Sequence, residues 1–346
     1  MSNPPVRLLG IASALPPHPL PQGTVIEAAR SILGPRFAQF ERLAPAFQNG
    51  GIDERRSVVP LEWFTAAHGW EERTAAFVDG ASDLFQEAAT RALDAAGLTA
   101  AEVDVIVTIC STGIATPTLE ARVAGRMGFR NDVIRVPVFG LGCAGGASGL
   151  GIARDLAAAR PGVTVLLVAV EACTLLFRLD RLTKADIIAT ALFGDGAAAL
   201  VLRAVDDDTR PEVGAGYQHM WPDSLNIMGW SVEETGLGVI FDRSIPDFAT
   251  RELRPALDAL VPGHAPDRYV CHPGGAKVLV ALEHALNLQD GALDAERRVL
   301  ARAGNMSAPT VLFVLEEVLA QKQRGDLLVL ALGPGFTLSA VPVRVS

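Results

Sequence analysis

The chain has 346 residues, enough to bury the core of one large domain or of two fused halves. Its residues are 49% hydrophobic and 20% charged, as in ordered globular proteins, and its net charge is −9. An acidic chain of this kind lacks the basic face that nucleic acids require, so we expect no nucleic-acid partner.

The N-terminal sequence and the cysteines indicate the compartment. MSNPPVRLLG lacks the charged and apolar regions of a signal peptide, and no apolar run approaches the ~18–20 residues of a membrane helix. We therefore expect a cytoplasmic protein without a membrane span, in which Cys110, Cys143, Cys173 and Cys271 are reduced. No two of them form a CxxC pattern, so we expect no structural zinc and no other bound metal.

Apolar segments alternate with helical ones along the first half. In chain order, the pattern predicts a helix over 81–96, strands over 103–110 and 133–139, a helix over 147–159, and strands over 163–170 and 196–203. Continuous apolar strands separated by helices are typical of a sheet that is covered on both faces. The chain is therefore predicted to be an α/β protein.

A polar segment at 206–211 (DDDTRP) indicates a boundary, which divides the chain into halves at 1–205 and 212–346. The second half repeats the order of elements. It is predicted to contain the end of a strand at 268–271, helices over 275–286 and 309–324, and strands over 326–332 and 336–345.

Cys143 lies in the segment GCAGG, between a predicted strand and a predicted helix. The glycines permit a tight turn and the close approach of a substrate. A cysteine at a helix N-terminus is placed where an anion is favoured, and such a position can lower a thiol pKa from ~8.5 to ~3.5–7.5. A buried cysteine in a packing turn is the alternative, but the strand–helix junction favours a nucleophile.

His272 and Asn305 lie in two further segments, CHPGG and GNMSAP. His272 follows a strand end and precedes a Gly-rich turn, which is where ligands bind in open α/β sheets. Asn305 precedes a predicted helix, and taken alone it is most simply a helix cap. A Cys, a His and an Asn that are distant in sequence can still meet in the fold.

The segments GCAGG, CHPGG, GNMSAP and LGPGFT, with ALFGDGAAA at 191–199, resemble in order and spacing the chalcone-synthase-like type III polyketide synthases. The resemblance extends from about Val6 to the C-terminus. It implies a thiolase fold, in which two similar α/β halves form five layers (αβαβα). It also implies that Cys143 is the nucleophile and that His272 and Asn305 are the catalytic histidine and asparagine.

The resemblance also implies which residues surround the substrate. These are Ser111 and Thr112 at a polar wall, Ser307 near the nucleophile, the loop Gly333-Pro334-Gly335 at the cyclisation cavity, and the wall residues Cys173, Leu176, Phe193, Trp230 and Val239.

Four of the wall positions depart from the plant pattern. Val239 replaces a second gatekeeping phenylalanine beside Phe193, Trp230 replaces a glycine, and Cys173 and Leu176 replace two threonines. These apolar walls favour an aliphatic starter over a coumaroyl ring, although Trp230 could cap the cavity and shorten the accepted chain.

The family binds CoA through basic residues that precede the segment here reading GGIDERR. The resemblance implies CoA contacts at Arg55, Arg56, Lys277, Gly274 and Gly275. Pro45 and Asn49 occupy positions where further basic residues would help to bind CoA, so the expected set of basic CoA contacts is incomplete. Each of these charges, taken alone, could equally be a solvated surface group.

The resemblance implies a decarboxylative condensation of an acyl-CoA starter with malonyl-CoA. His272 would hold Cys143 as a thiolate, and His272 and Asn305 would stabilise the malonyl enolate. The product would be an alkylpyrone, an alkylresorcinol or a related compound, and no cofactor is expected beyond the CoA thioester substrates. A homodimer is expected, because 114–118 (IATPT) falls where the family sends a loop to its partner subunit.

Three alternatives share part of this pattern. A ketoacyl-carrier-protein synthase III-like enzyme has the same fold and the same Cys, His and Asn, but its histidine segment is closer to HQAN. A papain-like hydrolase carries its cysteine near the mature N-terminus, unlike Cys143. A thiolase-fold scaffold without activity would not need these three residues intact.

Overall fold

The computed structural model describes residues 4–263 and 265–346. Within this part of the chain, the main sheet has ten strands: β1 (Val6–Ala14), β4 (Val105–Cys110), β5 (Ile134–Phe139), β6 (Val165–Ala172), β7 (Asp195–Ala204), β8 (Glu212–Val213), β9 (Tyr217–Met220), β12 (Arg268–Cys271), β13 (Gly325–Gly333) and β14 (Thr337–Val345). Their order is β12-β13-β14-β8-β1-β7-β6-β4-β5, with β9 also paired to β14. The short strand β8 pairs with β1 and β14, so the strands of both halves form one sheet.

Two hairpins and the helices complete the described structure. The hairpins pair β2 (His18–Pro21) with β3 (Glu54–Ser57) and β10 (Met228–Val232) with β11 (Leu237–Phe241). The α-helices are α1 (Gln22–Leu33), α2 (Phe40–Leu43), α3 (Pro45–Gln48), α4 (Trp70–Ala96), α5 (Leu119–Met127), α6 (Gly145–Ala159), α7 (Lys184–Leu192), α8 (Ile245–Leu260), α9 (Ala276–Ala285), α10 (Asp294–Ala303) and α11 (Thr310–Ala320).

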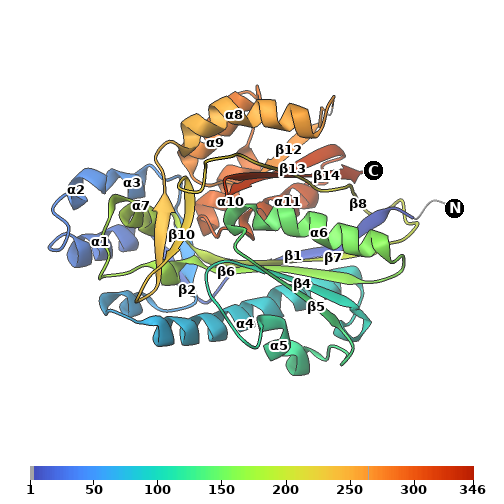
Figure 1. Cartoon of the computed structure of the whole chain (residues 1–346), viewed down its shortest axis with the longest axis horizontal. Helices are drawn as coiled ribbons and strands as arrows, with labels where there is room; N and C mark the ends of the chain where they lie inside the picture. The colour runs from blue at the N-terminus through green and yellow to red at the C-terminus, as the bar shows by residue number, and fades with distance from the viewer. Residues whose placement is uncertain (1–3, 264) are drawn as a thin grey trace.

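The elements stack in five layers, which Figure 1 shows from bottom to top. Helices α4 and α5 pack on the strands of the N-terminal half, and α6 and α11 lie between these strands and those of the C-terminal half. Helices α8 and α9 cover the far side of the C-terminal strands. This is the αβαβα order of the thiolase fold, as the sequence predicts.

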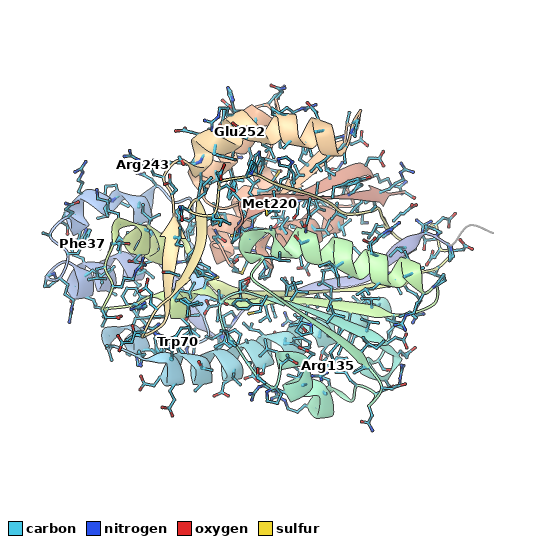
Figure 2. The ribbon with its side chains drawn as sticks, viewed as in Figure 1. Phe37, Trp70, Arg135, Met220, Arg243 and Glu252 are labelled. Atoms are coloured by element: carbon cyan, nitrogen blue, oxygen red, sulfur yellow. The ribbon has the colours of Figure 1, made fainter. Side chains whose placement is uncertain are left out.

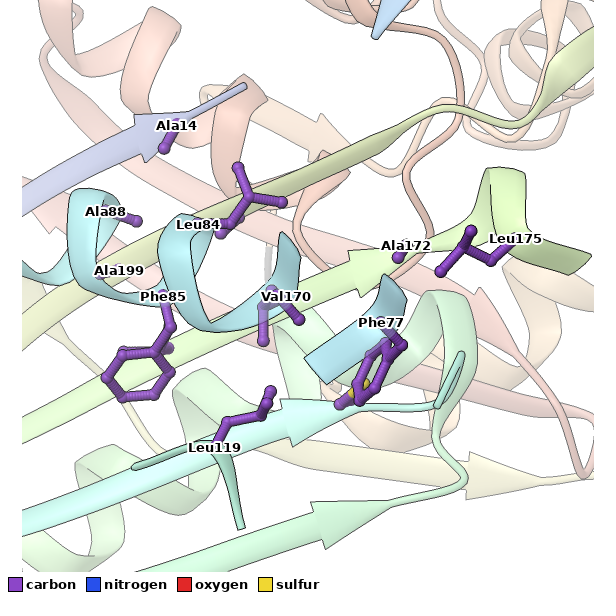
Figure 3. Packing of buried hydrophobic residues seen from close by; sticks show 14 of the residues in the cluster. Ala14, Phe77, Leu84, Phe85, Ala88, Leu119, Val170, Ala172, Leu175 and Ala199 are labelled. Carbon is purple, nitrogen blue, oxygen red and sulfur yellow. The ribbon is translucent and has the colours of Figure 1, made fainter. Parts of the chain in front are cut away.

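Three apolar clusters fill the spaces between the helical layers and the strands. Figure 3 shows the lowest cluster, in which Phe77, Leu84 and Phe85 of α4 pack towards Val170 and Ala199 of the sheet. Buried residues on α4 recur three, four or seven positions apart, which is the stripe that an amphipathic helix presents to a core. The second cluster surrounds α6 and α11, and the third lies under α8 and α9.

Most predicted elements are found within one or two residues of their expected ends, and three differ. The helix expected over 81–96 is longer, because α4 already begins at Trp70. The helix expected over 309–324 ends at Ala320, because the chain turns through a left-handed Lys322 (φ 56°) into β13. The strand expected over 133–139 is not covered on both faces. It forms the edge strand β5, on which Ile134 and Phe139 are 45% and 56% exposed.

Candidate active site

Cys143 lies in a single 3₁₀ turn, Gly142–Ala144, between the end of β5 and the beginning of α6. Neighbouring groups press closely on this turn. A Cβ atom added at Gly142 would lie 2.7 Å from Pro334 Cδ, and one added at Gly145 would lie 2.6 Å from Ile109 Cγ2. Gly142 also has a left-handed φ of 48°, so the glycines beside Cys143 are required by geometry as well as by packing.

The three residues expected to be catalytic meet at one apolar cavity, here called the catalytic cavity. The Cys143 thiol lies 4.0 Å from Asn305 Oδ1. That oxygen also accepts a hydrogen bond from the Ser307 backbone N–H (2.8 Å), and Asn305 Nδ2 donates to the Gly274 carbonyl (3.2 Å). His272 lines the same cavity just beyond the end of β12. Asn305 therefore faces the thiol and does not cap α11.

Burial dominates the electrostatics of this cavity. It raises the pKa of the Cys143 thiol to about 11, so the prediction that the helix N-terminus lowers this pKa is wrong for the thiol taken alone. Burial also lowers the pKa of His272 to about 3. Neither ring nitrogen of His272 has a hydrogen-bond partner among the described residues. Each group on its own is therefore neutral near pH 7.

Two further cavities continue from the catalytic cavity. A small chamber is lined by Cys143, Phe193, Trp230, Ser307 and Pro334, among others, and shares Met228 and Phe241 with the catalytic cavity. An outer apolar pocket adjoins the chamber at Phe193 and encloses about 660 Å³ of empty space, its open mouth included. The Phe193 and Trp230 rings meet edge to face, 5.9 Å apart.

The structure groups the expected substrate residues into two sets. Phe193, Val239, Cys173 and Leu176 all line the outer apolar pocket, whereas Trp230, Ser307 and Pro334 line the small chamber beside the thiol.

The flanking glycines of the loop Gly333-Pro334-Gly335 pack close to the nucleophile turn. A Cβ added at Gly333 would lie 2.5 Å from the Ala144 backbone nitrogen, and Gly335 has a left-handed φ of 115°. The Ser307 hydroxyl is buried beside the Cys143 thiol, whose pKa it lowers by hydrogen bonding, and it makes no other hydrogen bond among the described residues.

Ser111 and Thr112 line none of these three cavities, which differs from the expected polar wall. Their backbone N–H groups both donate to Glu171 Oε2 at 2.9 Å, and the Thr112 hydroxyl donates to the same oxygen at 2.6 Å. The Ser111 hydroxyl accepts a hydrogen bond from the Gly142 backbone N–H (2.9 Å). Both residues therefore support the nucleophile turn from behind.

Glu171 is the buried anchor of this support, and the sequence analysis missed it. It lies near the end of the apolar strand β6 and is fully buried, and burial raises its pKa to about 7. The available signal was an acidic residue that interrupts an otherwise apolar strand.

The prediction that Arg55 contacts CoA is wrong. Residues of β3 alternate between facing inward and outward, and Arg55 faces inward with 2% of its surface exposed. Its guanidinium donates to the carbonyls of Thr190 (2.6 Å) and Phe193 (2.8 Å). The neighbouring Arg56 is partly exposed but lies 3.3 Å from the Glu54 carboxylate.

The other expected CoA residues lie at the beginning of α9. Gly274 lines the catalytic cavity, Gly275 directly precedes the helix, and Lys277 is exposed in the first turn. Ile245, the first residue of α8, lines the same cavity. Arg243, labelled in Figure 2, is exposed two residues before it and is a second cation near this rim that the sequence analysis missed.

Across residues 4–263 and 265–346, no three His, Cys, Asp or Glu side chains are grouped as metal ligands. In the same part of the chain, no helix combines the length and the apolar character that crossing a membrane requires.

Known proteins match the whole length of this chain. The family of chalcone and stilbene synthases matches through its N-terminal domain at residues 64–206 and through its C-terminal domain at residues 212–346. A 1,3,6,8-tetrahydroxynaphthalene synthase of Streptomyces peucetius subsp. caesius is 41% identical, over 96% of this chain and 92% of its own. A putative chalcone synthase of Bacillus subtilis (strain 168) is 32% identical, over 95% of this chain and 96% of its own.

Solved structures agree with this match. The crystal structure of 1,3,6,8-tetrahydroxynaphthalene synthase from Streptomyces coelicolor A3(2), described as a bacterial type III polyketide synthase, has a TM-score of 0.92. It is 27% identical and covers 98% of this chain and 99% of that one. The match to both family domains favours this family over the ketoacyl-carrier-protein synthases. The chain therefore belongs to the chalcone and stilbene synthase family and is a type III polyketide synthase of the bacterial type, an acyltransferase of the condensing class.

Proposed function

We propose that this synthase loads an acyl-CoA starter on Cys143, extends it iteratively with malonyl-CoA, and cyclises the chain to an alkylpyrone, an alkylresorcinol or a related product. Enzymes of this family act on CoA thioesters without a further cofactor. The proposal rests on one observation above all: Cys143, His272 and Asn305 converge on one buried apolar cavity.

In the loading step, the Cys143 sulfur attacks the thioester carbonyl of the starter. The Cys143–acyl bond forms, the bond from the acyl carbon to the CoA sulfur breaks, and His272 takes up the thiol proton and passes it to the departing CoA thiolate. Because burial disfavours each charge separately, thiolate and imidazolium would form as a mutually attracting pair.

In the extension step, malonyl-CoA loses CO2 and leaves an enolate. Asn305 Nδ2 uses one hydrogen for the Gly274 carbonyl, so its second hydrogen is available to the enolate oxygen, together with His272 as a further donor. The enolate carbon then attacks the acyl carbonyl on Cys143 and releases the sulfur for the next round.

The apolar lining of the outer pocket supports an aliphatic starter. Cys173, Leu176 and Val239 offer no strong donor for a phenol, and each buried CH2 contributes roughly 0.8 kcal/mol, so a few methylenes give a preference of tens-fold or more. We expect medium- or long-chain acyl-CoA to outcompete coumaroyl-CoA and acetyl-CoA.

A second product class competes with this one. The 41% identical relative is named for 1,3,6,8-tetrahydroxynaphthalene, a product without an alkyl chain. The edge-to-face pair of Phe193 and Trp230 stands between the small chamber and the outer pocket, which favours a compact product of that kind. Incubation with malonyl-CoA alone and with a panel of acyl-CoA starters, with products identified by mass, distinguishes the two.

We also propose a homodimer that joins through β5. This edge strand presents an unpaired backbone edge and the exposed side chains of Ile134 and Phe139. Ile114, in the 114–118 loop, is 54% exposed. A second copy of the same chain would cover both features.

The central test is Cys143→Ala. We expect polyketide formation to be abolished, since the thiol carries the starter, while malonyl-CoA decarboxylation by His272 and Asn305 remains measurable. Release of CO2 and product formation are followed in parallel. Full condensing activity in this variant would overturn the proposal.

A further inference from the structure

Helix α7 ends directly before Phe193, and groups from outside the helix bind the carbonyls at its end. The last carbonyls of a helix have no partner within it, so such bonds determine where the following residue lies. The donors are Arg55 Nη1 to the carbonyls of Thr190 and Phe193 (2.6 and 2.8 Å), Gln22 Nε2 to the carbonyl of Ala191 (3.0 Å) and the Asn305 backbone N–H to the carbonyl of Leu192 (2.9 Å).

The same segment is bonded to the backbone of Asn305 from both sides. The Asn305 N–H donates to the Leu192 carbonyl, and the Gly194 N–H donates to the Asn305 carbonyl at 3.0 Å. Together these bonds form a parallel bridge between Phe193 and Asn305. A shift of Phe193 would therefore also move Asn305.

Arg55 fills the space behind this bridge. A Cβ added at Gly304 would lie 2.7 Å from Arg55 Cγ, and one added at Gly194 would lie 3.3 Å from Arg55 Cβ. The stem of Arg55 thus packs against the residue before Asn305, while its guanidinium holds the carbonyl of Phe193. One side chain contacts both segments of the bridge.

The charge of Arg55 suits this position. Burial lowers its pKa to about 10, so the guanidinium remains protonated at pH 7. A cation is favoured at a helix C-terminus, where the partial charge is negative. A buried cation persists only where it is compensated, and here the two backbone carbonyls and the nearby charge of Asp195 do so.

We propose that Arg55 is a positioning residue that fixes Phe193 and Asn305 relative to one another and so sets the geometry of the enolate donor. The proposal rests on the function proposed above, because it requires Asn305 to act on malonyl-CoA. It assigns Arg55 a role within the protein interior in place of the expected contact with CoA.

The test is Arg55→Lys, assayed by malonyl-CoA decarboxylation. Both bonds come from Nη1, and the shorter lysine side chain cannot place its ammonium group where that nitrogen lies. Displacing a donor by about 1 Å costs on the order of 10²-fold in rate, so we expect kcat to fall by ~10- to 100-fold while KM changes little. Unchanged kcat in folded Arg55→Lys would overturn the proposal.

A double-mutant cycle separates positioning from general damage. Asn305→Ala alone is expected to lose ~10²–10³-fold, the usual cost of one donor. If Arg55 acts through Asn305, adding Arg55→Lys to Asn305→Ala lowers kcat little further. Fully additive losses would overturn the proposal. Unchanged decarboxylation in Asn305→Ala alone would instead contradict the proposed function.

Gln22→Ala is the matched control. It removes a buried donor to the same end of α7 but leaves Gly304 and Asn305 untouched, so we expect kcat to be retained. An equal kcat loss in Gln22→Ala would show that loosening α7 is by itself sufficient to lower kcat. The role of Arg55 would then be merely structural. Should Arg55→Lys not fold, Gly194→Ala presses on the bridge without changing Arg55 itself, with a Cβ 2.5 Å from the Ala303 carbonyl, and the same selective kcat loss is expected. Unchanged kcat in folded Gly194→Ala would then overturn the proposal.

Discussion

At the scale of single residues, burial decides the chemistry of Cys143. The helix N-terminus favours an anion, but the desolvation of a buried thiol is the larger effect. The same burial opposes a charge on His272. An opposite charge on the other group of the cavity would offset part of this desolvation cost, so ionisation of one group favours ionisation of the other.

This reasoning predicts how the reactivity of Cys143 depends on pH. In His272→Gln the thiol has no basic partner, so burial opposes its ionisation unaided and its alkylation by iodoacetamide should require high pH. In the wild type the midpoint of this pH profile should lie lower, because the imidazole accepts the proton. Cys143→Ser corrects for the other three cysteines, which are also buried. Coincident profiles in wild type and His272→Gln would show that the two groups do not ionise as a pair.

At the scale of elements, the β10–β11 hairpin contributes side chains to the walls of two cavities. Trp230 on β10 faces the small chamber, and Val239 on β11 faces the outer pocket. Trp70, at the beginning of α4 in Figure 2, donates from its indole to the Glu233 carbonyl (2.9 Å) and so ties the hairpin to the N-terminal half.

Val239→Phe tests this hairpin. Val239 is 4% exposed, so a larger ring would occupy the pocket and shift the preference towards shorter starters. Cys173→Phe, at another residue that lines the same pocket, should shift it in the same direction. Val232→Phe is the control, since it makes the same change in the same hairpin at a side chain that is 77% exposed. Chain-length profiles are measured by competition between acyl-CoA starters. Unaltered profiles in both pocket variants would show that the acyl chain does not pass these residues.

At the scale of the whole molecule, one end of the sheet is the edge strand β5. Arg135, labelled in Figure 2, and the exposed Ile134 and Phe139 lie on β5 at this edge. Long unprotected edges are rare in stable monomers, because they pair with other chains.

We therefore expect a dimer by light scattering at micromolar concentration. Ile134→Glu places a charge on the edge and should shift the protein towards the monomer. Leu225→Glu adds the same charge at a side chain that is 73% exposed and lies outside β5, and it should leave the dimer intact. A monomeric wild type would contradict the expected assembly.

The sequence by itself determined the family, the α/β layering and the identity of Cys143, His272 and Asn305 as candidates. These follow from local patterns: apolar strands, helical spacing, and chemically distinctive residues in glycine-rich turns whose backbone cannot tolerate other side chains. Such information is carried by neighbours in the chain.

Only the tertiary structure decided which side chains are buried, which line the cavities and which bond to distant residues. Arg55 and Arg56 are adjacent and chemically identical, yet the pleat of β3 buries one and exposes the other. Ser111 and Thr112 turn from the cavity to Glu171, some sixty residues away, because a buried carboxylate requires donors. The pKa of Cys143 likewise depends on how much water the surrounding layers exclude, and that exclusion comes from residues throughout the chain and not from the turn around the cysteine.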